Sequence, residues 1–219
     1  EESGQPMQGF FLNARRPQLQ DRKVREALAY AFDFESMNRT IFYNSYVRTD
    51  SYWEGQDLAQ SGLPQGRELE ILEPYRDRLP PEVFTQEYKP PVFDTPQAAR
   101  ENLRKAVDLF KQAGYVSRDG KLVNEKTGEQ FKLEFLQNDP SDERVDGPFV
   151  ENLRKLGIDA TMRVIDASQY VARINNFDFD VLSSVLQQSS SPGNEQREYW
   201  STKAADFPGS RNLSGIKDP

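Results

Sequence analysis

The chain contains no cysteine and no histidine. The absence of cysteine excludes thiol nucleophiles and thiolate metal sites, and it leaves no disulfide evidence about the compartment. Histidine is the commonest general base and metal ligand near neutral pH, so its absence excludes a Ser-His-Asp triad and the usual zinc sites. An enzyme built on this chain would depend on carboxylates, lysine or tyrosine. We predict no metal site and no cofactor.

Long apolar runs and a basic surface are also missing. The longest apolar runs have the length of a strand, whereas a membrane helix needs about 20 apolar residues. The formal net charge is −7, and basic residues alternate with acids, as in Asp21–Glu26, so we expect neither a nucleic-acid partner nor membrane insertion. Glu1–Gly4 lacks the basic start and apolar stretch of a signal peptide, so any targeting segment would lie outside this sequence.

Three helices are predicted from N-caps followed by periodic apolar residues. Asp21 and Asp33 are the expected caps of the first two. Thr95 is the expected cap of the third, with Pro96 in its first turn and Gly114 just after its end.

The second half of the sequence alternates between strands and helices. Strands are predicted at Phe131–Leu136, Ile158–Ile165 and Phe179–Leu186, and Asp166 with Gln169 forms a capping box for a helix before the last strand. Helical crossovers between such strands are right-handed and make the strands parallel. The predicted fold class is therefore α/β, a three-layer lobe with a mixed β-sheet flanked by helices.

Two local features carry further expectations. A hairpin is predicted between residues 121–123 and 131–135. The helix that Gly157 ends is expected to bend, or to start late, at Pro148.

Residues 43–91 have no regular periodicity and are rich in proline and glycine. A structureless loop of that length is improbable inside a compact domain. The segment is either an irregular, packed excursion or a binding loop whose aromatic surface comes from Tyr43, Tyr46, Tyr52 and Trp53.

A polar stretch, 187–197, follows the last predicted strand. Open α/β sheets bind ligands beyond the carboxyl ends of their strands, so this stretch is a candidate site, although an ordinary polar loop would have the same composition. Aromatic faces and a few polar groups are typical of ligand sites in general. The candidate ligand-binding residues are Gln187, Gln188, Ser189, Ser190, Asn194, Phe10, Asn13, Tyr52 and Trp53.

Several segments resemble, in the same order, the extracellular solute-binding protein family 5, the peptide- and nickel-binding components of ABC importers. The strand Gly9–Asn13 is followed by the run D-x-x-V-R-x-A-L-x-x-A-x-D at Asp21–Asp33. Ala106–Tyr115 is similar to the A-x-x-L-x-x-A-G-Y helix end with one extra residue, and Leu153–Ile158 matches L-x-x-L-G-I. The segments 48–52, 66–74 and 191–196 resemble the YejA-type subgroup.

The resemblance implies one lobe of a two-lobed periplasmic binding protein of class II, joined by hinge strands, that is not an enzyme. The partners it implies are an oligopeptide ligand and ABC permease subunits in the inner membrane. Residues 1–219 would form a single C-terminal lobe, with the N-terminal lobe missing. Its parts would be a hinge strand near 9–13, an irregular excursion 43–91, an α/β core 95–200 and a truncated end 211–219.

Gln188 departs from the family pattern. The di- and oligopeptide binders carry an Asp four residues before a proline, and that Asp pairs with the peptide's α-ammonium group. Counting back from Pro192 reaches Gln188, so we expect ligands with a blocked N-terminus, such as N-formylated microcin C, or a register that leaves the ammonium in water. An acid of the missing lobe, or Glu195, could fill the role instead.

Two other functions stay open from the residues alone. A hydrolase that uses two carboxylates, such as a glycosidase, needs paired acids at a defined separation, which sequence cannot reveal. A lobe that only docks on a permease or partner would lack a ligand-lining loop.

Overall fold

The computed structural model describes residues 6–218 and divides the chain into two compact units. Glu1–Gln5 and Pro219, the last residue of the expected end segment 211–219, lie outside the described residues. The larger unit comprises Gln8–Val47, Pro91–Val185 and the residues from Pro192 onward. The smaller unit is made mainly of Arg48–Pro90 and Leu186–Ser191.

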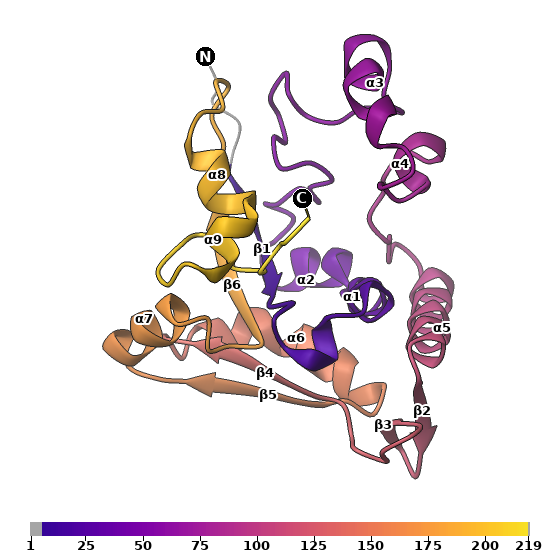
Figure 1. The fold of residues 1–219 in the computed structure, drawn as a ribbon. Helices are drawn as coiled ribbons and strands as arrows, with labels where there is room; N and C mark the ends of the chain where they lie inside the picture. The colour runs from indigo at the N-terminus through magenta and orange to yellow at the C-terminus, as the bar shows by residue number, and fades with distance from the viewer. Residues whose placement is uncertain (1–5, 219) are drawn as a thin grey trace. The chain divides into compact units, whose positions relative to one another are not determined.

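The larger unit is built on a four-stranded sheet. Its strands are β1 (Met7–Leu12), β4 (Lys132–Gln137), β5 (Asp159–Val164) and β6 (Val181–Leu186), in the order β1-β6-β4-β5 (Figure 1). β4 pairs in parallel with both β5 and β6. The three predicted strands and their parallel pairing are confirmed.

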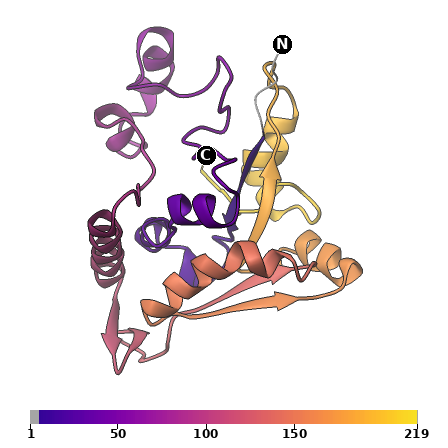
Figure 2. The same ribbon diagram turned by 180° about the vertical axis from the view of Figure 1, so that it is seen from behind.

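Helices cover both faces of this sheet, so the unit has three layers. Leu133 and Phe135 of β4 belong to the main core with Phe149 of α6 (Asp142–Lys155), which lies along β4 and β5 (Figure 2). Leu136 belongs to a second core against which α7 (Ala167–Asn175) packs Tyr170. Alternate residues of β4 therefore serve opposite faces, as the two-residue repeat of a strand requires. The predicted α/β fold is confirmed.

The predicted helix caps form as expected. Asp21 accepts a hydrogen bond from Lys23 N at the start of α1 (Arg22–Ala29), and Asp33 accepts one from Ser36 N before α2 (Phe34–Thr40). Thr95 accepts from Ala98 N at the start of α5 (Pro96–Gln112), and Asp166 accepts from Gln169 N before α7. A 3-10 turn, η1 (Pro17–Leu19), precedes α1.

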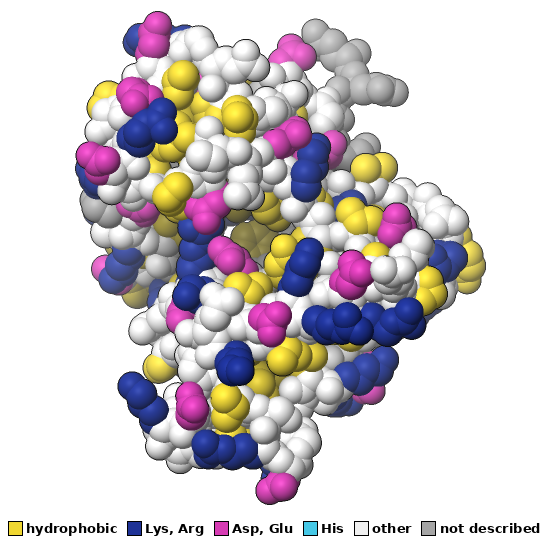
Figure 3. Space-filling model, turned by 90° about the vertical axis from the view of Figure 1, so that its right-hand side faces the viewer, with side chains coloured by type: hydrophobic (Ala, Val, Ile, Leu, Met, Phe, Trp, Pro, Cys, Tyr) yellow, Lys and Arg dark blue, Asp and Glu magenta, His cyan; other side chains and the backbone are white. Residues whose placement is uncertain are grey.

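The outward face of α5 carries charges of both signs. Figure 3 views the side of the molecule that α5 covers and shows basic and acidic side chains next to one another. The opposite face of the helix buries Ala106 and Phe110 in the main core. The exposed charged residues of α5 are Arg100, Glu101, Arg104, Lys105, Asp108 and Lys111.

The predicted hairpin forms in part. β3 (Lys121–Asn124) meets the segment before β4 through the antiparallel bridge Val123–Gln130 and through hydrogen bonds from Asn124 N to Glu129 O and from Phe131 N to Leu122 O, each 2.8 Å long. On its other side β3 pairs antiparallel with β2 (Tyr115–Arg118), a strand that was not predicted. Asp119 and Gly120 both have positive φ, 52° and 75°. An Asp-Gly pair with this geometry makes a two-residue turn that closes a hairpin on the strand before it.

Of the two alternatives expected at Pro148, a bend or a late start of the helix, the late start was wrong. α6 begins at Asp142 and contains Pro148 in its interior. Asp142 and Glu143 place negative charge in the first turn, where it is favourable.

The smaller unit contains short helices that no sequence pattern indicated. They are α3 (Gly66–Leu72), η2 (Glu73–Tyr75) and α4 (Glu82–Thr85). None of the three buries a residue, so they have no apolar stripe from which to predict a helix. The remainder of 48–90 has no helix or strand, as expected for the irregular excursion.

Two helices, α8 (Glu195–Trp200) and α9 (Thr202–Asp206), follow the polar stretch in the larger unit. Within residues 6–218, no helix has the length and apolarity needed to cross a membrane.

Candidate ligand-binding site

The loop that follows β6 is held through its backbone by two side chains of the smaller unit. Trp53 Nε1 donates to the carbonyl oxygen of Ser189 at 3.1 Å, and Gln56 Nε2 donates to that of Gln188 at 3.1 Å. We call residues 187–191 together with Trp53 and Gln56 the loop site. Because backbone carbonyl groups accept these bonds, Trp53 and Gln56 constrain the loop through its backbone.

Trp53 is in turn positioned by local hydrogen bonds. Ser51 Oγ accepts from Trp53 N and from Gln60 N, each at 3.2 Å. Gln60 Nε2 lies 3.2 Å from the carbonyl oxygens of Asp50 and Tyr88. A serine side chain that accepts from the backbone two residues later is a turn-forming arrangement, which explains how an irregular segment holds a defined shape.

Gln56 is the residue of the loop site that sequence reasoning missed. Its Oε1 atom is buried and makes no hydrogen bond, while its Nε2 atom binds the loop. A glutamine in an irregular segment carries no pattern that would have identified it. The buried acceptor is available to a hydrogen-bond donor.

The predicted loop residues differ in exposure. Gln187, Ser189 and Ser190 are exposed, and Gln188 is half-buried. Ser189 Oγ donates to the carbonyl oxygen of Ser191 at 2.9 Å and accepts from its N–H, so this hydroxyl helps to shape the loop.

Tyr52 also lies in the smaller unit, with 46% of its surface exposed. Desolvation raises the pKa of its hydroxyl, and neighbouring Tyr88 raises it further. The hydroxyl therefore stays protonated at neutral pH and can donate as well as accept.

Phe10, a candidate of the larger unit, lies among aromatic core residues. Its ring centroid is 5.5 Å from that of Phe32, 5.7 Å from Phe135 and 5.2 Å from Phe149. These are the spacings of packed aromatic pairs. The surroundings of Phe10 favour a packing role.

Asn13 is fully buried, and both ends of its amide are in use. Nδ2 donates to the carbonyl oxygens of Phe177 at 2.9 Å and Phe179 at 2.8 Å. Oδ1 accepts from Arg15 N and from Arg15 Nη1. The side chain thus joins the end of β1 to the segment before β6.

Asn194 is exposed and precedes α8 without making a side-chain cap. The next residue, Glu195, accepts from Gly193 N at 2.8 Å, and this bond is the main reason why the pKa of its carboxyl is lowered. The carboxylate that could substitute for the missing Asp is thus used in a local turn.

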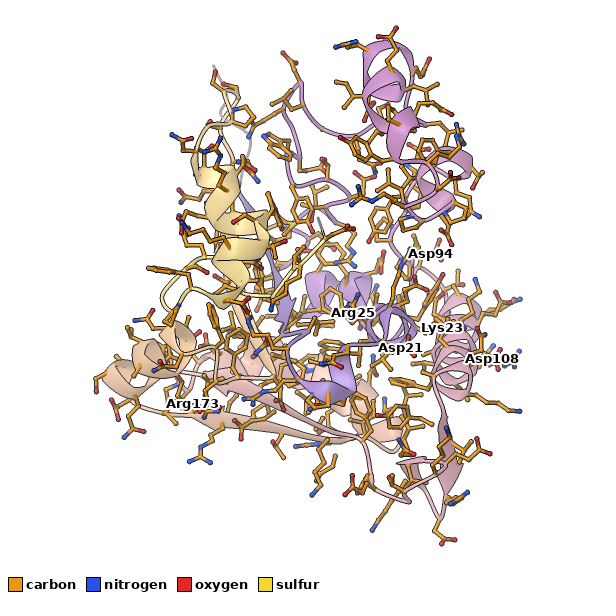
Figure 4. All side chains as sticks on the ribbon, in the orientation of Figure 1. Asp21, Lys23, Arg25, Asp94, Asp108 and Arg173 are labelled. Carbon is orange, nitrogen blue, oxygen red and sulfur yellow. The ribbon has the colours of Figure 1, made fainter. Side chains whose placement is uncertain are left out.

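The acids gathered near the start of β6 are compensated by arginines. Arg16 pairs with Asp178 at 2.8 Å and with Asp180 at 3.1 Å. Arg173, labelled in Figure 4, pairs with Glu134 at 3.1 Å and with Asp178 at 3.3 Å. The hydrogen bond from Arg16 is the first cause of the lowered pKa of Asp178. In the part of the chain that the structure describes, no group of three acids is placed to hold a metal ion.

The structure thus brings some candidates together within one unit. Gln187–Ser190, Tyr52 and Trp53 belong to the smaller unit, and hydrogen bonds link Trp53 and Gln56 to the loop. Phe10, Asn13 and Asn194 belong to the larger unit.

Comparisons with known proteins place the chain among binding proteins. The model of the bacterial extracellular solute-binding proteins, family 5 Middle, matches residues 1–207. The probable peptide-binding protein YejA of Agrobacterium fabrum is 52% identical over 97% of this chain, and the match covers 35% of that protein. The peptidoglycan-binding protein YepA of the same organism is 37% identical over 97% of the chain and 35% of its own length.

A solved structure of similar fold is the oligopeptide-binding protein AppA from Bacillus subtilis in complex with a nonapeptide. The TM-score is 0.64 at 20% identity, over 99% of this chain and 38% of that one. At this identity the likeness concerns the fold. The chain spans about a third of the length of the curated relatives that it matches.

Proposed function

The chain belongs to the bacterial extracellular solute-binding proteins of family 5, and on this premise we propose that it forms the C-terminal lobe of a periplasmic receptor that captures oligopeptides and delivers them to an ABC permease. The observation that carries the proposal is the loop site, a polar loop beyond a buried parallel strand whose backbone is held by Trp53 and Gln56. The name of the Agrobacterium relative, a probable peptide-binding protein, supports peptide as the ligand class.

The chemistry of the loop site suits a ligand that varies in sequence. Amide and hydroxyl side chains both donate and accept, so they can bind peptide N–H and C=O groups whatever side chains the peptide carries. Trp53 and Gln56 hold the loop through its backbone carbonyl groups. A loop that is already ordered loses less entropy when a ligand binds.

Exposed apolar side chains of the smaller unit supply a second kind of contact. A peptide ligand presents apolar and polar groups in turn, and binding sites for such ligands are mostly apolar with a few polar groups that fix orientation. The large apolar residues that this unit exposes are Tyr52, Leu58, Leu63, Ile71, Tyr75 and Tyr88.

The two alternatives have less support. A hydrolase would need two carboxylates free to act on a substrate, whereas Asp178, Asp180 and Glu134 are bound to arginines. A lobe that only docks would have no use for a held polar loop. A direct measurement of peptide binding distinguishes the proposed receptor from both the hydrolase and the docking lobe.

The first test compares the 219-residue chain with the protein at the full length of its relatives. We expect the isolated chain to bind a peptide library much more weakly, because half of a two-sided cleft leaves one face of the peptide in water, where hydrogen bonds contribute little. Calorimetric titration measures both affinities. Equal affinities would contradict the two-sided cleft, and no binding by the full-length protein would contradict the receptor function.

The second test concerns Gln188. An amide cannot neutralise the ammonium group of a peptide, whereas it can donate to and accept from a formyl group. We expect N-formylation of one peptide to strengthen its binding to the wild-type full-length protein, and Gln188→Asp to reverse the order. N-formylated microcin C is a ligand of this kind. Tenfold tighter binding of the free amine by wild type, about 1.4 kcal/mol, would exclude a preference for blocked N-termini.

The third test separates the role of Trp53 in the loop from its aromatic bulk. Trp53→Phe retains a ring but removes the N–H that donates to Ser189, so we expect it to weaken peptide binding about as much as one lost hydrogen bond, roughly 1 kcal/mol. Trp53→Ala should weaken it further. The matched control is Trp200→Phe, which removes a tryptophan N–H that donates to Gln196 Oε1 in the larger unit. Unchanged affinity in both Trp53 variants would assign that residue to packing alone.

A further inference from the structure

A buried amide–acid pair lies at the carboxyl end of β4, inside the larger unit. Gln137 is the last residue of β4 and Asp146 lies in α6, and each is 2% exposed. Gln137 Nε2 donates to Asp146 Oδ2 at 2.7 Å. Neither residue belongs to the loop site, so the role of this pair is independent of the proposed function.

The pair leaves two buried oxygen atoms without a hydrogen bond, Oε1 of Gln137 and Oδ1 of Asp146. Both atoms are acceptors when the carboxyl group is ionised. A buried polar group without a partner is unfavourable, and a buried charge without a partner is more so. The arrangement lacks one donor that could serve both oxygens.

The charged and titratable groups around Asp146 do not supply a positive charge. Asp142 lies one turn earlier in α6, and its negative charge opposes ionisation of Asp146. Tyr170 of α7 faces both carboxyl groups, and its own pKa is raised first by burial and then by Asp142 and Asp146. Among the ion pairs of residues 6–218, none includes Asp146.

We propose that Gln137 and Asp146 form a binding site for one proton. In the protonated state Oδ1–H of Asp146 donates to Oε1 of Gln137, while Nε2–H of Gln137 donates to Oδ2 of Asp146. The two bonds close a ring between a neutral acid and an amide. A single proton thus satisfies both orphaned oxygens and removes the buried charge.

The energetics agree with this assignment. The pKa of Asp146 is raised to about 6, mainly by burial, with the Gln137 hydrogen bond lowering it and the charge of Asp142 raising it. Because the folded pKa lies above that of an unfolded aspartate, 3.8, proton binding favours the folded state. This stabilisation is complete below pH 3.8 and is lost as the pH rises through about 6.

The site therefore makes one region of the larger unit sensitive to pH. The turn between β4 and α6 and the first turns of α6 lie between the two residues. Above about pH 6 the buried carboxylate is uncompensated, so opening of this turn to water becomes less costly.

The experiment uses the 219-residue chain with Asp146→Asn. An asparagine presents an N–H to Gln137 Oε1 at every pH, so the variant mimics the protonated pair. We expect the ratio of wild-type to variant folding constants to be about tenfold larger at about pH 5 than at about pH 8, measured by urea denaturation. The matched control is Glu143→Gln, which removes an exposed carboxylate from the same helix and should leave the pH dependence unchanged.

A second measurement does not depend on any variant being folded. The carboxyl ¹³C shift of Asp146 in the wild-type chain, followed by NMR from about pH 3 to about pH 8, should titrate near 6. Titration below about 4.5 would overturn the proposal, and would instead mean that a buried water molecule donates to both oxygens of an ionised pair. A pH dependence in Asp146→Asn equal to that of wild type would also overturn it.

Discussion

Gly157→Ala is expected to destabilise the larger unit by about 3 kcal/mol or more. A Cβ atom at this position would lie 2.6 Å from Leu122 N and 2.8 Å from Gly120 O, both backbone atoms of the β2–β3 hairpin. Neither can move without breaking local structure, because Leu122 N also donates to Gly157 O at 2.9 Å. The φ of Gly157, +86°, adds strain for any residue with a side chain.

The control for this prediction is Gly114→Ala. Gly114 also has a positive φ, +91°, and also follows a helix, yet a Cβ atom there would meet nothing within 4 Å. Its substitution should cost about 1–2 kcal/mol, the penalty of the left-handed conformation alone. Urea denaturation of both variants isolates the steric part. Equal costs would show that the hairpin can yield at Gly157.

Asn13→Ala is expected to cost about 3 kcal/mol or more, because four hydrogen bonds end on its amide. Truncation removes the donor of the Phe177 carbonyl oxygen, and it leaves the Phe179 carbonyl oxygen with only the hydrogen bond from Arg16 Nε. It also removes an acceptor of Arg15, whose guanidinium holds the chain near its end by donating to the carbonyl oxygens of Ala205, Asn212 and Leu213.

Two further variants test the same site. Asn13→Asp should be at least as harmful, since a carboxylate cannot donate to the two carbonyl oxygens that Nδ2 serves. Asn194→Ala is the control, because this exposed asparagine makes no side-chain cap, and it should change stability by less than about 0.5 kcal/mol. Thermal or urea denaturation measures all three. If the Asn13→Ala variant is stable and well folded but binds peptide more weakly, Asn13 is a ligand-binding residue.

Asn13 shows how a candidate chosen by position can have another role. It is a candidate from sequence because it ends the hinge strand and carries a polar side chain that suits a ligand. The structure surrounds it with backbone carbonyl groups from a segment that is 164 or more positions away in sequence. No feature of the sequence near position 13 indicates that contact.

The sequence by itself determined the local structure of this protein. The caps Asp21, Asp33, Thr95 and Asp166 and the three parallel strands followed from residue types at fixed offsets, because a cap or a strand repeat depends on neighbours a few residues away. The family followed from motifs of the same short range. The Asp119-Gly120 pair is likewise a local turn signal, and it accounts for the β2–β3 hairpin, whose first strand was not predicted.

Only the tertiary structure decided which polar groups meet. Gln56 reaches the loop beyond β6 across 132 positions of sequence, and Asp146 reaches Gln137 from another element. Such pairs depend on how helices and strands pack, and a lone glutamine or aspartate has the same local signature whether it is solvated or buried. Burial then decides how such a side chain titrates. Desolvation is the main reason why Asp146 has a pKa of about 6, and no sequence pattern reports desolvation.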